Sequence, residues 1–239
     1  MKLRDKTAVI TGGSKGLGKA IAKAIIKEGA RVIICGRDEN DLKKTHKELS
    51  EYGNIEYIKA DISKKRHVIR LKNEINKKYE EIDILVNNAS TLGHRVPILD
   101  YPEEIWDRTI HTNLNAQFYV IKRLLPMLLK SHNEPSIINV SSSVGRQGKA
   151  NWGAYAASKF GLEGLTQVLA DELKSKVRVN SVNPGGTRTE MRAEAYPDED
   201  PSTLPHPDDI TAVFVYLSSD ESKNITGEAF NARDWIDKH

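Results

Sequence analysis

Short apolar runs alternate with longer amphipathic segments along almost the whole chain, and this alternation constrains the fold more than any other feature. Six runs are short, rich in β-branched residues and apolar on both faces, at 7–11, 31–35, 55–60, 82–87, 136–140 and 177–182. Helical patterns follow them at 16–28, 38–50, 63–79, about 102–131, about 152–174 and about 207–218. Strands that are apolar on both faces and alternate with helices are typical of a parallel sheet covered on both sides.

Crossover connections between parallel strands are right-handed, so the pattern predicts a doubly wound sheet. We expect an α/β protein: a Rossmann-type parallel sheet of about seven strands, flanked by helices on both faces, in a single domain that spans 1–239. The segment 189–208 interrupts the alternation, because it holds four prolines and many charges. We expect it to form an excursion that helps to shape a substrate site.

Composition argues against several other classes of protein. The 239 residues are 38% hydrophobic and 29% charged, which supplies both a core and a solvated surface. The net charge of +3 is mild and its charges are interleaved, so no nucleic-acid partner is expected. Cys35 is the single cysteine and the histidines are scattered, so we expect neither an internal disulfide nor a metal site. No apolar run suits a signal peptide or a membrane span, so a cytoplasmic protein without a membrane partner is expected.

Three glycines, Gly12, Gly16 and Gly18, lie between the first predicted strand and the first predicted helix, in TGGSKGLG. Their spacing is G-x3-G-x-G rather than the common G-x-G-x-x-G. Without a Cβ the backbone can approach a pyrophosphate, and a helix N-terminus presents free N–H groups to it. A tight turn alone would also explain the glycines, but their place in the first βαβ unit favours nucleotide binding.

The end of the second predicted strand favours NADP over NAD. A fold that prefers NAD usually places an acidic residue there for the ribose 2′-hydroxyl. Here the strand ends in Gly36 and Arg37, and Lys15 lies in the glycine turn, so two cations are available for a 2′-phosphate. Asp38 comes next, but its position suits the N-cap of the following helix. NAD is kept as the alternative cofactor, since Arg37 could also be a solvated loop charge.

A tyrosine and a lysine, Tyr155 and Lys159, lie four residues apart in YAASK, within a predicted helix. This spacing places both on one helix face. A nearby ammonium group stabilises a phenolate and lowers the phenol pKa from its usual value of about 10. Such a phenol can exchange a proton during catalysis. Two common residues also reach this spacing by chance, so the pair alone leaves both interpretations open.

Several motifs, taken together, resemble those of the short-chain dehydrogenases/reductases over nearly the whole chain. TGGSKGLG looks like the glycine motif of that family. The other matching segments follow in the family's order: ADIS at 60–63, NNAS at 87–90, HTNLN at 111–115, INVSSSVG at 138–145, YAASK at 155–159 and NPGGTRT at 183–189. Ser90 replaces a glycine of the family pattern, and Thr187 occupies a position that is often Val or Ile.

The resemblance implies a catalytic set of four residues. The family's serine lies about a dozen residues before the tyrosine, which selects Ser142 among three consecutive serines to hydrogen-bond the substrate oxygen. Tyr155 would be the general acid in reduction. Lys159 would hold the nicotinamide ribose and lower the pKa of the tyrosine, and Asn113 would position a water that links the lysine to solvent.

The resemblance also implies the cofactor contacts. Asp61 would bond the adenine amino group, and the segment that begins at Pro184 would contact the nicotinamide. The full predicted set is Gly12, Ser14, Lys15, Gly16, Leu17, Gly18, Arg37, Asp61, Ile62, Asn88, Ala89, Tyr155, Lys159, Pro184, Gly185, Thr187 and Thr189.

The function implied is that of an NADP-preferring oxidoreductase that interconverts a ketone and a secondary alcohol. We expect carbonyl reduction with NADPH, with a 3-oxoacyl thioester as one candidate substrate. A catalytically silent, cofactor-sensing protein of the same fold is the main alternative. A nucleotide-sugar epimerase or dehydratase is less favoured, because the chain is short for the extra substrate domain. The resemblance further implies a homotetramer or dimer. The substrate itself would be set by 91–97, the loop after Gly145 and 189–208.

Overall fold

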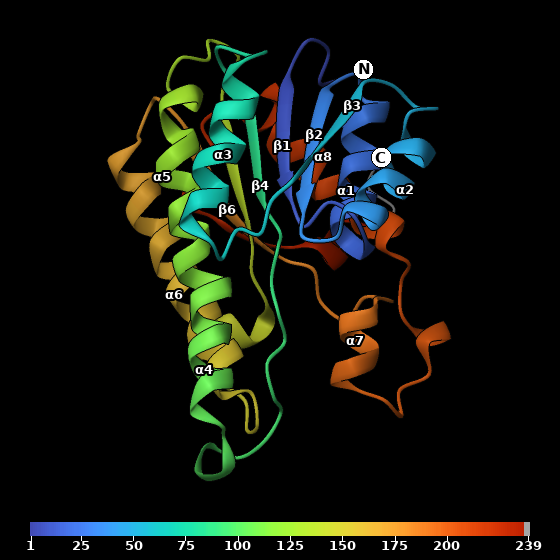
Figure 1. Ribbon diagram of the computed structural model, residues 1–239, viewed down its shortest axis with the longest axis vertical. Coiled ribbons are helices and arrows are strands. Elements are labelled where there is room, and N and C mark those ends of the chain that lie inside the picture. Colours follow the sequence, from blue (N-terminus) through green and yellow to red (C-terminus); the bar gives the residue numbers. More distant parts are fainter. Residues whose placement is uncertain (237–239) are drawn as a thin grey trace.

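A seven-stranded parallel sheet with helices on both faces forms the centre of the computed structural model, which describes residues 1–236 (Figure 1). The strand order is β3-β2-β1-β4-β5-β6-β7. The strands are β1 (Thr7–Thr11), β2 (Arg31–Gly36), β3 (Ile55–Lys59), β4 (Ile84–Asn87), β5 (Ser136–Val140), β6 (Arg178–Asn183) and β7 (Ala229–Asn231). The order reverses between β1 and β4, so the predicted doubly wound α/β fold is confirmed.

Two layers of helices cover the sheet (Figure 1). One layer holds α1 (Gly16–Lys27), α2 (Glu39–Leu49) and α8 (Ala212–Ser218). The other holds α3 (Lys65–Asn76), α5 (Ala116–Leu128) and α6 (Gly153–Glu172). Two shorter helices, α4 (Glu103–Ile110) and α7 (Glu190–Ala195), lie beyond the sheet.

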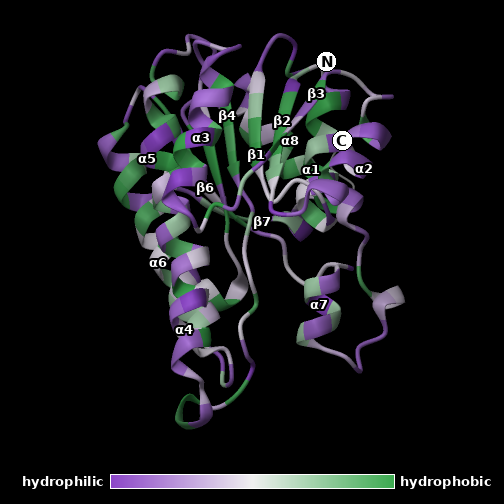
Figure 2. Cartoon of the chain, viewed as in Figure 1, coloured by the Kyte–Doolittle hydropathy of each residue, from purple (hydrophilic) through white to green (hydrophobic). Residues whose placement is uncertain are grey.

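Side chains that alternate along the strands divide the core into two clusters, one on each face of the sheet. Ala8 and Ile10 of β1 belong to the cluster beside α1 and α8, whereas Val9 belongs to the cluster beside α3 and α5. All three are fully buried. Burial on both faces explains the almost continuous apolar runs in the sequence. The hydrophobic residues of these strands are drawn in green in Figure 2.

Three elements differ from the sequence predictions. The helix predicted at about 102–131 is broken into α4, a π-helical turn (His111–Asn115) and α5. The helix predicted at about 207–218 begins with a 3₁₀ turn (Pro207–Ile210), and α8 starts only after it. The seventh strand, β7, has no matching apolar run, because it is three residues long at the edge of the sheet and none of its side chains is fully buried.

The carboxyl ends of the strands face the region where α4, the first half of α6 and α7 extend beyond the sheet (Figure 1). The segment 189–208 leaves the sheet after β6 and contains α7 and a 3₁₀ turn (Pro201–Thr203). It therefore forms the excursion that its prolines predicted. In Figure 1 this segment lies across from α4 and α6, beyond the carboxyl ends of the strands.

Candidate active site

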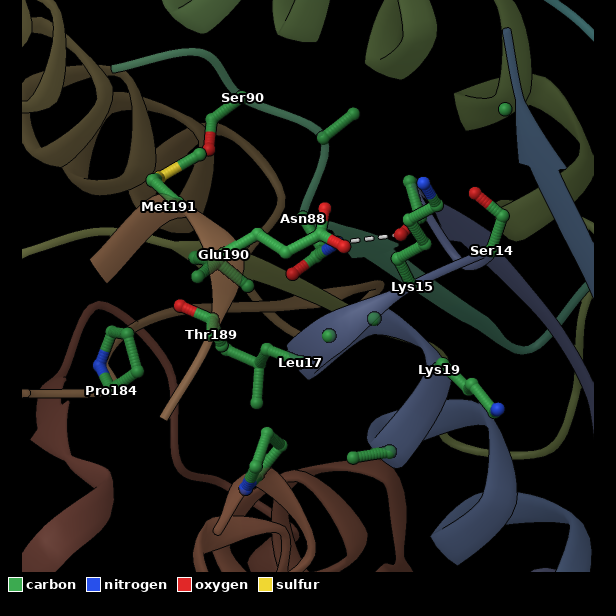
Figure 3. Close-up of a pocket in the computed structure, with 18 of the residues that line it drawn as sticks. Ser14, Lys15, Leu17, Lys19, Asn88, Ser90, Pro184, Thr189, Glu190 and Met191 are labelled. Carbon is green, nitrogen blue, oxygen red and sulfur yellow. Dashed lines mark hydrogen bonds between the residues drawn. The ribbon is translucent and has the colours of Figure 1, made fainter. Parts of the chain in front are cut away.

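A cleft of about 1080 Å³ lies at the carboxyl ends of the strands. Every residue predicted to bind the cofactor lines it, as does Ser142. Asn113 is the one predicted site residue that does not. Figure 3 shows residues of the glycine turn, among them Lys15 and Leu17, with Thr189, Glu190 and Met191 of the 189–208 segment on the other side. The cleft is thus formed jointly by the sheet and the excursion.

The glycine turn is packed too closely for larger residues. Gly12 has a φ of +65°, and a Cβ there would lie 2.9 Å from the Cα of Ala89. A Cβ on Gly18 would overlap the carbonyl oxygen of Gly12. Asn88, at the end of β4, donates from Nδ2 to the carbonyl oxygens of Thr11 and Gly12, at 3.0 and 3.1 Å (Figure 3). The turn is therefore fixed by backbone geometry from both β1 and β4.

The start of α1 is open to an anion. Its N-cap residue, Lys15, makes no side-chain capping hydrogen bond, and the first turn contains no acidic residue. The unpaired N–H groups and the positive end of the helix dipole therefore favour a phosphate at this position. A Cβ on Gly16 would lie 3.6 Å from Cγ2 of Thr189, so the excursion passes directly beside the turn.

The tip of β2 offers a cation, and the carboxylate beside it, Asp38, is engaged in capping a helix. Asp38 caps α2, since its Oδ1 accepts from the backbone N of Asn40 and Asp41 at 2.8 and 3.0 Å. The predicted capping role is therefore confirmed. Lys15 forms an ion pair with Asp41 at 3.0 Å. Arg37 is exposed and has no ion pair within residues 1–236. Of the two cations predicted for a 2′-phosphate, Arg37 is the one that forms no ion pair among residues 1–236, although its charge also acts on the Asp61 carboxylate.

The predicted adenine contact, Asp61, is partly engaged within the protein. Its Oδ1 accepts from the backbone N and Oγ of Ser63, at 3.0 and 2.7 Å. Burial acts to raise the pKa of Asp61, but these hydrogen bonds outweigh it and the pKa is lowered. The carboxylate is therefore held charged at the edge of the cleft, and its contact with adenine stays a prediction.

Ser142, Tyr155 and Lys159 meet on one wall of the cleft. Burial raises the pKa of Tyr155 to about 12, and a hydrogen bond with Ser142 acts in the opposite direction. The Nζ of Lys159 lies 5.5 Å from the centroid of the Tyr155 ring and donates to the carbonyl oxygen of Val140 at 2.8 Å. The expected lowering of the tyrosine pKa by the lysine is therefore wrong for this structure, because burial is the larger effect.

Lys159 itself is buried in a weakly polar environment. Burial lowers its pKa to about 8, while the carboxylate of Glu163, one helical turn further on, acts to raise it. Glu163 is held by Arg146 Nε at 2.9 Å and by Ser181 Oγ at 2.6 Å. The charge state of Lys159 is thus set by an opposition between desolvation and one fixed carboxylate.

The three consecutive serines differ in their environment. Ser141 and Ser142 line the cleft, whereas Ser143 is exposed and starts a 3₁₀ turn. Ser141 is buried, and its Oγ has no hydrogen-bond partner. Only Ser142 is hydrogen-bonded with Tyr155. The serine implied by the family spacing is therefore the one beside the phenol.

Asn113 lies in the π-helical turn and is fully buried. Its Oδ1 accepts from the backbone N of Thr91 at 2.8 Å, and its Nδ2 donates to the carbonyl of Thr91 at 2.9 Å and to Ser158 Oγ at 3.2 Å. The side chain thus fastens the segment after β4 to α6. Its predicted role in placing a water stays a prediction.

The substrate end of the cleft contains residues that sequence reasoning missed. Trp152 lines the cleft, and its ring centroid lies 5.5 Å from that of Tyr155. Apolar neighbours complete this end of the cleft: Leu92, Met191 and Ala195. A signal for Trp152 was present, because it comes three residues before Tyr155 at the N-cap of α6.

The described part of the chain lacks two further kinds of feature. Within residues 1–236, no helix is both long and apolar enough to cross a membrane. Over the same residues, no group of three or more His, Cys, Asp or Glu side chains is arranged to hold a metal ion.

Comparison with known proteins identifies the family. The family model for short chain dehydrogenases matches residues 6–200. The uncharacterized oxidoreductase YciK of Escherichia coli K12 is 41% identical over 235 residues, which cover 97% of this chain and 93% of that protein. The chain therefore belongs to the short-chain dehydrogenase family of oxidoreductases.

Solved structures agree with this assignment. A short chain dehydrogenase of Shigella flexneri 2a, crystallised with NADP, superposes with a TM-score of 0.94 at 41% identity and covers 97% of this chain and 98% of its own. A homologue from E. coli CFT073, crystallised with NADPH, has a TM-score of 0.94 at 40% identity with the same coverage. A 3-oxoacyl-[acyl-carrier-protein] reductase of Thermotoga maritima is 34% identical, with 95% of this chain and 96% of that protein covered.

Proposed function

We propose that the protein is an NADPH-dependent reductase that converts a carbonyl compound, in the first place a ketone, into an alcohol. One observation carries this proposal: Tyr155 and Ser142 share a single cleft with the glycine turn and the unpaired Arg37. A proton donor and a dinucleotide-binding turn are thus combined in one site.

The residues present fit a nicotinamide dinucleotide. The uncapped start of α1 suits the pyrophosphate. Arg37 suits a 2′-phosphate, and Asp38 is already used as a helix cap. The bound states of the Shigella and E. coli CFT073 homologues support NADP as the cofactor. NAD is the less favoured alternative, since the carboxylate at the β2 tip, Asp38, is engaged in capping α2.

The bound nicotinamide supplies the hydride. The protein supplies the proton and the polar groups that stabilise the developing negative charge. Negative charge builds on the carbonyl oxygen as reduction proceeds, and the hydroxyl of Ser142 is placed to donate a hydrogen bond there. Tyr155 is protonated at neutral pH, because its pKa is about 12, and it can deliver the proton that completes the alcohol. Lys159, when charged, stabilises the phenolate that results.

A silent cofactor-sensing protein is the alternative. Such a protein has no need for a proton donor beside the cofactor turn, and here Ser142 and Tyr155 are both in place. A 3-oxoacyl thioester is one candidate substrate, supported by the T. maritima reductase.

We also propose a homo-oligomer, a tetramer or a dimer, as the functional form. Three large apolar side chains are exposed on α5 and α6: Phe118 at 42%, Phe160 at 46% and Val168 at 54%. Exposed large apolar side chains favour burial against another copy. Phe160→Glu should convert the assembly to monomers in analytical ultracentrifugation, whereas an unchanged sedimentation coefficient would exclude this face. A cytoplasmic location is proposed with it.

The experiment that tests the activity is a panel of ketones, aldehydes and 3-oxoacyl thioesters, assayed with NADPH and NADH in parallel. Absorbance loss with NADPH, and much less with NADH, is expected. Binding of NADPH without oxidation by any carbonyl in the panel would favour the sensing protein instead.

A further inference from the structure

Three cations surround one phenol ring at the outer edge of the substrate end. The Cζ of Arg192 lies 3.9 Å and the Cζ of Arg95 lies 4.2 Å from the centroid of Tyr196. The Nζ of Lys149 lies 5.7 Å from the same centroid and donates to the Tyr196 hydroxyl at 3.2 Å. They come from three segments: the loop after β4, the loop before α6, and the 189–208 excursion.

Carboxylates balance only one of these cations. Arg192 forms a two-pronged pair with Glu199, from Nε and Nη2, both at 2.6 Å. Among residues 1–236, Arg95 and Lys149 have no carboxylate partner, and the Nε of Arg95 is buried without a hydrogen-bond acceptor. An aromatic face offsets part of the cost of a partly desolvated cation, but does not neutralise it. The cluster therefore carries a net positive charge that no carboxylate among residues 1–236 balances.

The pKa of the Tyr196 hydroxyl reflects this positive charge. Burial acts to raise the pKa of Tyr196, yet the hydrogen bond from Lys149 and the charges of the surrounding cations outweigh burial, and the pKa is lowered. A negative group near the ring would be favoured by the same potential.

The cluster lies close to the proposed proton donor. The Cζ of Arg95 is 4.8 Å from the ring centroid of Trp152, and that ring is 5.5 Å from Tyr155. Trp152 lines the cleft, is 7% exposed, and has a buried Nε1 without a partner. One aromatic ring thus separates the unbalanced guanidinium from the phenol. Arg95 and Lys149 lie outside the lining of the cleft, so a ligand held at Tyr155 would extend past Trp152 to reach Arg95.

We propose that Arg95, assisted by Lys149, binds an anionic group of the substrate, a carboxylate or a phosphate. The inference rests on the proposed function, because it takes the carbonyl of the same substrate to lie at Tyr155. The part between the two groups would be apolar, since Leu92, Trp152 and Met191 line the intervening wall. The substrate class is therefore an amphiphilic carbonyl compound with a negative charge about one aromatic ring away from the reacting carbon.

Matched probes test this class. The probes are 4-acetylbenzoate, its methyl ester and 4-acetylphenyl phosphate, each reduced with NADPH. We expect kcat/KM to be about tenfold or more higher for at least one anion than for the neutral ester, since hydrogen bonds to charged groups are strong. The preferred anion distinguishes a carboxylate from a phosphate substrate. Equal kcat/KM for all three would overturn the proposal.

Variants of Arg95 test whether this residue causes the preference for an anionic substrate. Arg95→Gln should lower kcat/KM for the preferred anion about tenfold and change that for the ester less than about twofold. Arg95→Lys should keep part of the preference. Arg4→Gln is the control, because it removes the same charge from an exposed position just before β1. This position lies at the amino ends of the strands, away from the cleft at their carboxyl ends. An equal loss with anion and ester in Arg95→Gln would indicate a structural role for the cluster and overturn the proposal.

Binding separates this inference from the proposed activity. Calorimetric titration of the NADPH-loaded protein with 4-acetylbenzoate and with 4-acetylphenyl phosphate measures the affinity for each anion, and this measurement does not depend on turnover. Anion binding that Arg95→Gln abolishes, without reduction of any probe, would refute the reductase and retain the anion site. Reduction of the neutral ester without anion binding would retain the reductase and refute the site.

Discussion

The two ends of the cleft are built in different ways. At the cofactor end, the glycine turn, Asn88 and the start of α1 are positioned by β1 and β4, and backbone contacts fix their geometry. At the substrate end, the walls combine loops with the short helix α7 and the start of α6, joined by side-chain contacts such as the stack of Arg95 on Tyr196. The cofactor end is therefore set by the fold, whereas the substrate end is set by the particular side chains of this chain.

The largest effect is expected where the two ends meet. Tyr155→Phe should lower kcat for carbonyl reduction by about 10²- to 10⁴-fold, since it removes the general acid. NADPH affinity should change little. Tyr79→Phe is a matched control, because burial also raises the pKa of Tyr79 to about 12 but its hydroxyl bonds Glu56 away from the cleft. Stopped-flow and fluorescence titration give the two quantities, and unchanged kcat in Tyr155→Phe would remove this residue from the chemistry.

A smaller but still large effect is expected at the cofactor end. Gly18→Ala would place a Cβ against the Gly12 carbonyl, so the turn must move. A strain of about 1–3 kcal/mol corresponds to a loss of about 5- to 150-fold in NADPH affinity if it falls on the bound state. Gly148→Ala is the control, as no atom lies within 4 Å of its added Cβ. Equal NADPH affinity in both variants would show that backbone geometry does not govern this end.

These positions also show how much the sequence could predict. Residues of the cofactor end were predictable, because local backbone geometry restricts the residue types there: Gly12 by its positive φ, and Asp38 by the few side chains that cap a helix. The cation cluster was not predictable, since Arg95, Lys149 and Tyr196 lie far apart in the chain and meet only through loop conformation. The strand β7 and the raised pKa of Tyr155 were missed for a related reason, because edge pairing and burial are tertiary properties.

Cofactor choice should depend on a single side chain. Arg37→Gln should weaken NADPH binding by about tenfold and leave NADH binding almost unchanged, because one charged contact to the 2′-phosphate is lost. Arg4→Gln should alter neither. Isothermal titration with both cofactors measures the ratio. A parallel loss of NADPH and NADH affinity in Arg37→Gln would show that this residue supports the site without reading the phosphate.

The smallest expected effect is a shift in pH dependence. Lys159 has a pKa of about 8 and is charged below that pH, so kcat/KM for NADPH should fall as the pH rises through about 8. The Glu163 carboxylate acts to raise this pKa, so Glu163→Gln should move the fall to lower pH. Asp171→Asn, an exposed change on the same helix, should not move it. A shift to higher pH in Glu163→Gln would mean that this carboxylate does not hold the proton on Lys159.

The most direct test of the central claim is a crystal structure of the protein with NADPH. We predict the nicotinamide beside the hydroxyls of Ser142 and Tyr155, the pyrophosphate at the start of α1, and the 2′-phosphate in contact with Arg37. A nicotinamide bound away from Tyr155, or a phenol hydroxyl turned out of the cleft once the cofactor is bound, would contradict the account.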